Sequence, residues 1–289
     1  MNLITKQNSR PNGGFFLWPW GAIQFLSLLV VAAVLTACGD SDQQQPESLD
    51  KATEQDHLPP ESVENAKTAE EKRAFPVLKQ ANHEKFLRKF WEENPERVVR
   101  ITTNLGEIDI RLFEETPIHS ASFLMLSKRN YFKETLFTRV VPGFIIQAGS
   151  SDREELYLKR VLIGSYAPDP EFKPHLIHRR GALSAARPYE KNPEKRSSEY
   201  DFFIVVGRTF DEPQLMALER DHDKSFSEEH RKIYQTEGGA PHLDGEHTVF
   251  GEVVSGMDVV DKISQVPTDQ REWPREDVEI LKVEVLNEP

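Results

Sequence analysis

Short apolar segments separated by turn signals constrain the fold of this chain more than any other feature of its 289 residues. Ile108, Ile110 and Leu112 alternate with charged residues, which is the pattern of a strand with one buried face. Residues 104–106 supply a turn from a strand that begins near Val98, so a hairpin is predicted. Further strands are predicted at 137–149, 182–186, 202–206, 248–253 and 279–286.

Two main helices are predicted among these strands. Thr116 and Pro117 are typical of an N-cap followed by proline at the first helical position, for a helix that runs to about Lys128. Residues 256–264 carry apolar side chains at helical spacing. Many short strands, two helices and no regular alternation between them predict a mainly β fold, a closed antiparallel barrel.

The charge balance excludes some partners. The chain has 36 basic and 48 acidic residues, and only two basic residues and no acidic one fall in 1–37. The remainder therefore carries 34 basic and 48 acidic residues, a net charge of −14. Such a surface argues against nucleic acid as a partner and against electrostatic docking onto anionic lipid.

The N-terminus is predicted to be a targeting segment, 1–37, that takes no part in the fold. It has a basic start and an almost wholly apolar run at 21–34, followed by Leu-Thr-Ala-Cys at 35–38. This tetrapeptide resembles the bacterial lipobox, in which the cysteine is lipid-modified and the preceding residues are removed. Cys38 is the only cysteine and the predicted lipid attachment site. We therefore expect a signal peptide and a lipoprotein anchored to a membrane of the bacterial cell envelope, on the periplasmic side or the cell surface. An uncleaved membrane anchor ranks second, because a full span needs about 20 apolar residues.

Residues 38–74 are predicted to be a flexible tether, because they are polar and have too few apolar side chains to bury a core. From 75 to 97 apolar residues recur three and four apart, which predicts an N-terminal helix. We expect it to pack on the outside of the domain that follows, 98–289. A partner-binding helix is the alternative.

The segment 137–149 combines parts with unrelated physical roles. Arg139 is a permanent cation with fixed donors. Pro142 and Gly143 form a turn or bulge signal within an apolar strand. A strand places residues 139, 141, 145 and 147 on one face unless the Pro-Gly step changes the register. An arginine and a glutamine would then lie beside an apolar hollow. The competing interpretation is a buried strand whose arginine extends to solvent.

Three later segments occur with it in a recognisable order. They are Gly-Ala-Leu-Ser-Ala-Ala at 181–186, Phe-Phe-Ile at 202–204, and Leu-Asp-Gly-Glu-His-Thr-Val-Phe-Gly at 243–251, followed by Gly-Met-Asp-Val-Val at 256–260. Together with 137–149 they resemble the motifs of the cyclophilins, the β-barrel peptidyl-prolyl cis-trans isomerases. The resemblance implies an eight-stranded closed antiparallel barrel with two capping helices, and isomerisation of X-Pro bonds. It also implies that no cofactor is needed, that the clients are proline-containing polypeptides, and that the protein is a monomer.

The resemblance also implies roles for single residues. Arg139 matches the catalytic arginine, and Gln147 matches an amide that orients the arginine and the substrate. Ala186 matches a backbone contact to the residue before proline, and His247 matches a histidine at the pocket edge. The implied substrate-binding residues are Val141, Phe144, Ile145, Gln147, Ala186, Asp201, Phe203, His242, Leu243 and His247. The competing interpretation is that the apolar members are ordinary barrel core and that His247 is a hydrogen-bonded core histidine.

Some positions depart from the family pattern. Thr138 stands where histidine usually precedes the arginine, His242 where tryptophan or phenylalanine often lies, and Arg187 where asparagine is common. Asp201 stands where glutamine is usual, and its charge could repel acidic substrates or bind Arg139. We therefore predict reduced or altered activity and poor binding of cyclosporin-type ligands.

Two insertions, 187–199 and 210–239, adjoin the strands of the predicted pocket. They either shape the substrate groove or are solvated loops; 210–239 carries a helical pattern. The histidines at 175–178 and 242–247 have neither cysteine partners nor helical HExxH spacing, so we predict no metal site.

Two functions follow from these observations. The first is a peptidyl-prolyl isomerase that assists exported proteins to fold, which the set Arg139, Phe144, Gln147 and Phe203 favours. The second is a weakly catalytic or non-catalytic module that binds proline-containing peptides while tethered to the membrane. Thr138 and Asp201 favour the second.

Overall fold

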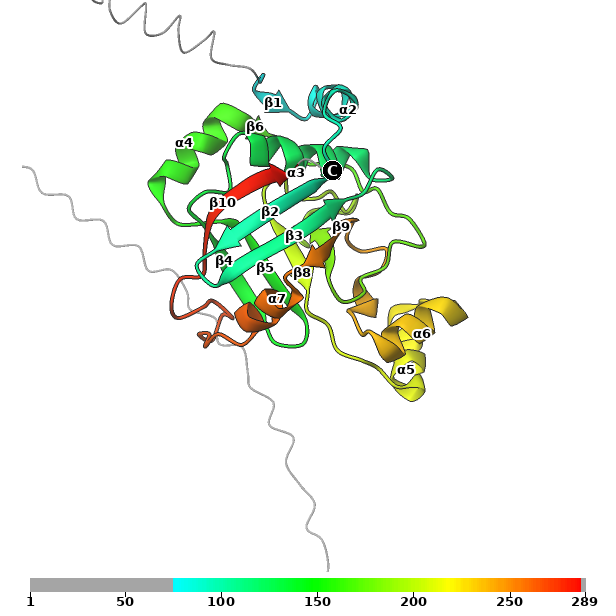
Figure 1. Cartoon of the computed structure of the whole chain (residues 1–289). Coiled ribbons are helices and arrows are strands. Elements are labelled where there is room, and N and C mark those ends of the chain that lie inside the picture. The colour runs from blue at the N-terminus through cyan, green and yellow to red at the C-terminus, as the bar shows by residue number, and fades with distance from the viewer. Residues whose placement is uncertain (1–74, 287–289) are drawn as a thin grey trace, which may run out of the picture. The chain divides into compact units, whose positions relative to one another are not determined.

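The computed structural model describes residues 75–286, whose strands close into a barrel with the order β10-β2-β3-β9-β7-β8-β5-β4 (Figure 1). The barrel strands are β2 (Val98–Thr103), β3 (Gly106–Leu112), β4 (Thr135–Val141), β5 (Ile145–Ser150), β7 (Ala182–Ala185), β8 (Phe202–Val205), β9 (Val249–Ser255) and β10 (Glu279–Leu286). The predicted targeting segment, the tether and Cys38 lie outside the described residues.

The barrel closes because β10 pairs with two neighbours. Val283 lies opposite Ile101 of β2, and Ile280 lies opposite Thr135 of β4. Every barrel pairing is antiparallel. The predicted closed, eight-stranded antiparallel barrel is confirmed. Closure leaves no unpaired sheet edge within it.

Six α-helices lie around the strands in the described part of the chain. They are α2 (His83–Glu93), α3 (Pro117–Lys128), α4 (Glu154–Ile163), α5 (Glu212–His222), α6 (Glu228–Thr236) and α7 (Met257–Ser264). Helix α3 packs on β9 and β10, and α7 packs on β3, β4 and β5, as two caps on the barrel. Helix α4 was not predicted. None of the helices in 75–286 is long and apolar enough to cross a membrane.

The start of α3 is capped differently from the sequence prediction. The Thr116 side chain makes no capping hydrogen bond. The Glu171 carboxylate accepts the backbone N–H groups of Ile118 and His119 at 3.2 and 3.0 Å. It also accepts His119 Nδ1–H at 2.6 Å. A negative group at a helix N-terminus satisfies free donors and interacts favourably with the helix dipole. The cap therefore comes from a distant loop.

The N-terminal helix is shorter than predicted. Helix α2 begins at His83, and the residues before it form β1 (Leu78–Lys79), which pairs in parallel with β6 (Gly164–Ser165). The side chain of Asn82 accepts the backbone N–H of Lys79 at 2.7 Å, which closes a turn between β1 and α2. Helix α2 packs against α3 through buried residues that include Leu87 and Phe90.

The segment 137–149 is a hairpin, so Pro142 and Gly143 form the turn rather than the bulge, and the expected single strand is two strands. Strand β4 ends at Val141 and β5 begins at Ile145. Pro142 fixes its own φ angle, and Gly143 adopts a φ of 69°, a left-handed conformation that glycine adopts without strain. The N–H of Phe144 donates to the Val141 carbonyl at 3.0 Å and closes the turn. Arg139 and Gln147 consequently lie opposite each other on neighbouring strands.

The apolar side chains form three clusters. The largest fills the barrel and the space under α2, α3 and α7. A second surrounds Ile145, Phe203, Val205 and Leu243. The third joins Ile177 to residues of the insertion 210–239, where α5 and α6 project from the barrel (Figure 1) and bury Leu215 and Tyr234. The interpretation of this insertion as a solvated loop was therefore wrong.

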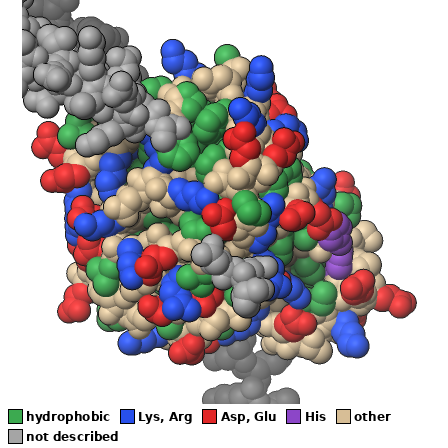
Figure 2. All heavy atoms as spheres, turned by 45° about the horizontal axis from the view of Figure 1, so that its top comes forward, with side chains coloured by type: hydrophobic (Ala, Val, Ile, Leu, Met, Phe, Trp, Pro, Cys, Tyr) green, Lys and Arg blue, Asp and Glu red, His purple; other side chains and the backbone are tan. Residues whose placement is uncertain are grey.

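Acidic and basic side chains are interspersed on the face of the molecule that Figure 2 shows. Charged side chains of the described residues also form many close pairs, such as Arg100 with Asp109 at 2.7 Å. The acidic excess thus forms no wide field of one sign on this face.

Candidate active site

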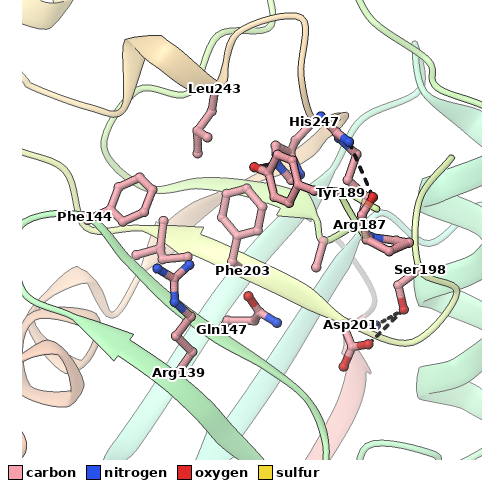
Figure 3. A pocket seen from close by; sticks show the side chains of 13 residues that line it. Arg139, Phe144, Gln147, Arg187, Tyr189, Ser198, Asp201, Phe203, Leu243 and His247 are labelled. Carbon is pink, nitrogen blue, oxygen red and sulfur yellow. Dashed lines mark hydrogen bonds between the residues drawn. The ribbon is translucent and has the colours of Figure 1, made fainter. Parts of the chain in front are cut away.

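A pocket of about 400 Å³ opens on the side of the barrel where β4, β5 and β8 lie next to each other. Arg139 pairs with Gln147 and Gln147 pairs with Phe203 across the three strands, so their side chains form a row (Figure 3). The lining residues are Arg139, Phe144, Ile145, Gln147, Ala186, Arg187, Pro188, Tyr189, Ser198, Asp201, Phe203, Leu243 and His247. The pocket thus brings together all but two of the predicted catalytic and substrate-binding residues.

Val141 and His242 are the two that do not line it. Val141 lies opposite Ile145 at the end of the β4–β5 hairpin. The His242 ring lies behind the pocket wall, tilted against the Phe144 ring with centroids 5.1 Å apart. Burial, with a smaller contribution from His222, lowers the pKa of His242 to about 4. His242 is therefore a neutral ring that supports Phe144 from outside.

Arg139 is held by a residue that the sequence analysis did not identify. Its Nε donates to Glu272 Oε2 at 2.6 Å, across 133 positions of sequence. The guanidinium carbon lies 5.8 Å from the centre of the Phe144 ring. Within 75–286 neither terminal nitrogen of Arg139 has a protein partner. The arginine therefore keeps its outer donors at the pocket.

The Gln147 side chain makes no hydrogen bond to any described residue, Arg139 included. The expected orientation of Arg139 by Gln147 is thus absent from this structure. An amide has two donors and an acceptor with two lone pairs, and all of them remain available at the pocket floor.

His247 has both ring nitrogens engaged. Nδ1 lies 2.9 Å from the Ala185 carbonyl, which can only accept, so Nδ1 carries the proton. Burial lowers the pKa of His247 to about 4, so the ring is neutral at pH 7. Nε2 must then accept, and the Tyr189 hydroxyl donates to it at 2.7 Å. A substrate that bonds to Nε2 must first displace Tyr189, which is 66% exposed.

Asp201 lies at the far end of the pocket from Arg139 (Figure 3) and does not pair with it. Its carboxylate accepts the Ser198 hydroxyl at 2.8 Å, and burial raises its pKa. Of the two effects considered for Asp201, binding to Arg139 is therefore not found, and Glu272 is the carboxylate that pairs with the arginine.

Ala186 has its backbone already bonded. Its N–H donates to the Asp201 carbonyl at 3.0 Å, and its carbonyl accepts the Ser198 N–H at 2.8 Å. Only the second lone pair of the Ala186 carbonyl remains for a substrate N–H.

The insertion 187–199 shapes the pocket, as one of the two interpretations proposed. Arg187, Pro188 and Tyr189 form one wall. The Arg187 side chain is 5% exposed and bonds the Glu246 carboxylate at 2.8 Å. The sequence signals for this wall were the insertion itself and the departure at Arg187 from the family pattern.

The insertion 210–239 lines no part of the pocket but supports the turn that carries Leu243. This turn is the short helix η1 (Pro241–Leu243). Lys224 Nζ donates to the His242 carbonyl at 2.7 Å and to the Asp244 carbonyl. The Tyr234 hydroxyl donates to Asp244 Oδ2 at 2.6 Å.

A serine, a histidine and an aspartate lie in hydrogen-bond contact behind Phe203. His178 Nε2 lies 3.0 Å from Ser184 Oγ, and Nδ1 lies 2.9 Å from Asp244 Oδ1. Ser184 and His178 are fully buried, and the Ser184 hydroxyl donates to the Thr248 carbonyl at 2.9 Å. A nucleophile needs an exposed oxygen facing a base. This triad is therefore structural.

The site is thus an apolar hollow with a fixed cation at its edge and an unpaired amide on its floor. Such a site suits a small apolar ring attached to a polar backbone.

Comparison with known proteins assigns the family. Residues 98–285 match the family model of cyclophilin type peptidyl-prolyl cis-trans isomerase/CLD. The chain belongs to the cyclophilin-type peptidyl-prolyl cis-trans isomerase family. It is 32% identical over 193 residues to the peptidyl-prolyl cis-trans isomerase of Acinetobacter baylyi, covering 65% of this chain and 85% of that protein.

A second relative is the peptidyl-prolyl cis-trans isomerase-like 2 of Rhizopus delemar. It is 32% identical over 196 residues, which are 66% of this chain but only 29% of the fungal protein. The chain thus spans less than a third of that relative. A crystal structure of a Cryptosporidium parvum cyclophilin type peptidyl-prolyl cis-trans isomerase is similar with a TM-score of 0.48 and 26% identity, over 67% of this chain and 99% of that one.

Proposed function

We propose that this protein is a peptidyl-prolyl cis-trans isomerase that acts on X-Pro bonds of exported polypeptides and assists their folding. One observation carries the proposal. Arg139 presents its two unpaired terminal nitrogens at the edge of an apolar pocket whose walls include Phe144, Phe203 and Leu243. Family membership supports the same activity.

The chemistry requires no nucleophile. An X-Pro bond rotates over a barrier of roughly 18–20 kcal/mol, because the nitrogen lone pair is delocalised into the carbonyl. In the twisted transition state the lone pair is localised on nitrogen. A guanidinium donor beside that nitrogen then stabilises the twisted form more than the planar one. The apolar walls hold the proline ring while the carbonyl side rotates.

The remaining pocket groups are available to bind the peptide backbone. The amide of Gln147 and the free lone pair of the Ala186 carbonyl can bond backbone groups of the client. His247 is held by Tyr189, so a client that bonds to the ring must exchange with the tyrosine hydroxyl.

Replacement of Arg139 by alanine tests the activity. We expect kcat/KM for isomerisation of a proline peptide by the purified full-length protein in detergent to fall by about 100- to 1000-fold, as when one transition-state donor is lost. Arg220→Ala is the matched control, because Arg220 is a surface arginine paired with Asp221. It should leave the rate unchanged.

The alternative, a non-catalytic module that binds proline peptides, predicts a different result. The wild type would then bind the peptide without accelerating its isomerisation, and Arg139→Ala would leave the rate at the uncatalysed value. Asp201 in the pocket is the observation that favours this alternative.

We also propose that the protein is a bacterial lipoprotein attached to a membrane of the cell envelope through Cys38, and that it acts as a monomer. The Leu-Thr-Ala-Cys sequence after an apolar run supports the anchor. A tether of about 35 residues would have a root-mean-square reach on the order of 30 Å from the membrane.

A further inference from the structure

The loop that follows α7 is built around the contact between Glu272 and Arg139. The Glu272 carboxylate accepts Arg139 Nε at 2.6 Å, and the Glu272 carbonyl accepts the N–H of Val140 at 2.8 Å. Glu272 therefore bonds to β4 through both its side chain and its backbone, at two consecutive residues of that strand.

The rest of the loop holds Glu272 in an unusual backbone conformation. Glu272 has a φ of 65°, which costs free energy for any residue other than glycine. Asp269 stabilises the turn, because its Oδ1 accepts the backbone N–H groups of Arg271 and Trp273 at 2.8 and 3.0 Å. Its carbonyl also accepts the N–H of Glu272 at 3.1 Å. A strained residue retained by surrounding bonds is often found where function requires its position.

The contact through Nε leaves the two terminal nitrogens of Arg139 free to bond a substrate. A guanidinium is planar, and a carboxylate on Nε sets the orientation of that plane. The side chains of Arg139 and Glu272 are 41% and 43% exposed, so their environment alone would not keep the arginine in one rotamer. Gln147, the residue expected to orient the arginine, lies opposite it but makes no hydrogen bond to it.

We propose that Glu272 is a positioning residue for isomerisation, which fixes the guanidinium of Arg139 with its terminal nitrogens facing the proline pocket. This inference rests on the proposed function, because it assigns a role to Arg139 in catalysis. Glu272 acts through Arg139 and does not touch the substrate.

Kinetics of Glu272→Ala test the proposal. We expect kcat of the full-length protein to fall by about tenfold to a hundredfold, as when a catalytic group is displaced by about 1 Å. The KM for the proline peptide should change little, because the apolar walls remain. Glu272→Gln keeps an oxygen that accepts from Nε, so its kcat should lie between those of the wild type and Glu272→Ala.

Glu276→Ala is the matched control. It removes the same charge from the same loop at an exposed residue that does not line the pocket, so its kcat should equal that of the wild type. A wild-type kcat in Glu272→Ala, or an equal loss of kcat in Glu276→Ala, would overturn the proposal.

A direct measurement covers the case in which Glu272→Ala folds poorly. The Arg139 Nε–H signal, assigned by its absence in Arg139→Lys, should be shifted and slow to exchange in ¹⁵N–¹H spectra of the wild type. In Glu272→Gln it should move toward the position of a solvated arginine. A signal already at that position in the wild type would disprove the contact.

The two proposals fail in distinguishable ways. If Arg139→Ala keeps the wild-type rate, the proposed function fails. If Arg139→Ala is inactive while Glu272→Ala keeps the wild-type kcat, only the role of Glu272 fails.

Discussion

Single side chains acquire their chemical state here from partners far away in the chain. Arg139 takes its orientation from Glu272, and His247 takes its tautomer from the Ala185 carbonyl. Tyr189 then occupies the nitrogen of His247 that would otherwise face the pocket. The resemblance to a family identified Arg139 and His247 but neither Glu272 nor Tyr189. The roles of Glu272 and Tyr189 follow from contacts with residues distant in the sequence, and no local sequence pattern indicates such contacts.

The neutral state of His247 predicts how stability depends on pH. Its pKa is about 4 in the folded state, where burial disfavours the charged ring, against 6.5 ordinarily. The unfolded chain therefore binds more protons between these values, so the folded state loses stability as the pH falls from 6.5 to about 4. The unfolding free energy that is lost over this pH range is roughly 3 kcal/mol, at 1.36 kcal/mol per pKa unit.

His247→Gln removes this titration. In urea unfolding, the stability of the wild type relative to the variant should therefore decrease as the pH is lowered from 7 to 4. A difference in unfolding free energy that stays constant over this range would contradict a neutral, buried His247.

Helices and strands formed largely where local patterns placed them. The hairpin at 98–112, the helix from Pro117 and the last strand were predicted with close to their observed bounds, because each has a periodic apolar pattern between turn signals. The exceptions have physical reasons. Pro142 and Gly143 turn the chain back on itself, and α4 has a weak pattern because many of its apolar side chains are exposed.

The cap of α3 predicts a large loss of stability when the distant Glu171 carboxylate is removed. Glu171→Ala leaves the N–H groups of Ile118 and His119 and the ring of His119 without their acceptor. Because hydrogen bonds to a charged group contribute about 1.5–3 kcal/mol, we expect the unfolding free energy to fall by about 2 kcal/mol or more.

Glu115→Ala is the comparison for this measurement. Glu115 pairs with His175 at 2.9 Å, but both side chains are more than half exposed, so the loss should stay within about 1 kcal/mol. Equal losses in the two variants on chemical denaturation would argue against capping by Glu171.

On the scale of the whole chain, the insertions add parts to a barrel that is complete without them. Residues 187–189 form a pocket wall, whereas α5 and α6 share a small core with Ile177 and brace the turn that carries Leu243. The barrel strands therefore carry most of the pocket, the insertion 187–199 adds a wall to it, and the insertion 210–239 supports the turn that carries Leu243.

The proposed anchor makes a prediction for the protein in the cell. Labelled fatty acid should be incorporated into the wild type and lost in Cys38→Ser, because a thiol is the site of attachment. Cys38→Ser should also release the protein from membranes on fractionation. Equal labelling of the two proteins would refute the lipoprotein assignment.

The amino-acid sequence alone was sufficient to predict the barrel, its two capping helices and most of the pocket residues. Alternation, turn residues and short motifs are local patterns, so they can be recognised without knowledge of the tertiary structure. It could not reveal the pairing of Arg139 with Glu272, the cap from Glu171 or the bond from Tyr189 to His247. These contacts join segments that approach only after the barrel has closed, so their geometry depends on packing and not on spacing along the chain. The sequence singled out Arg139 as the predicted catalytic residue, and the folded structure showed that the Glu272 carboxylate bonds it.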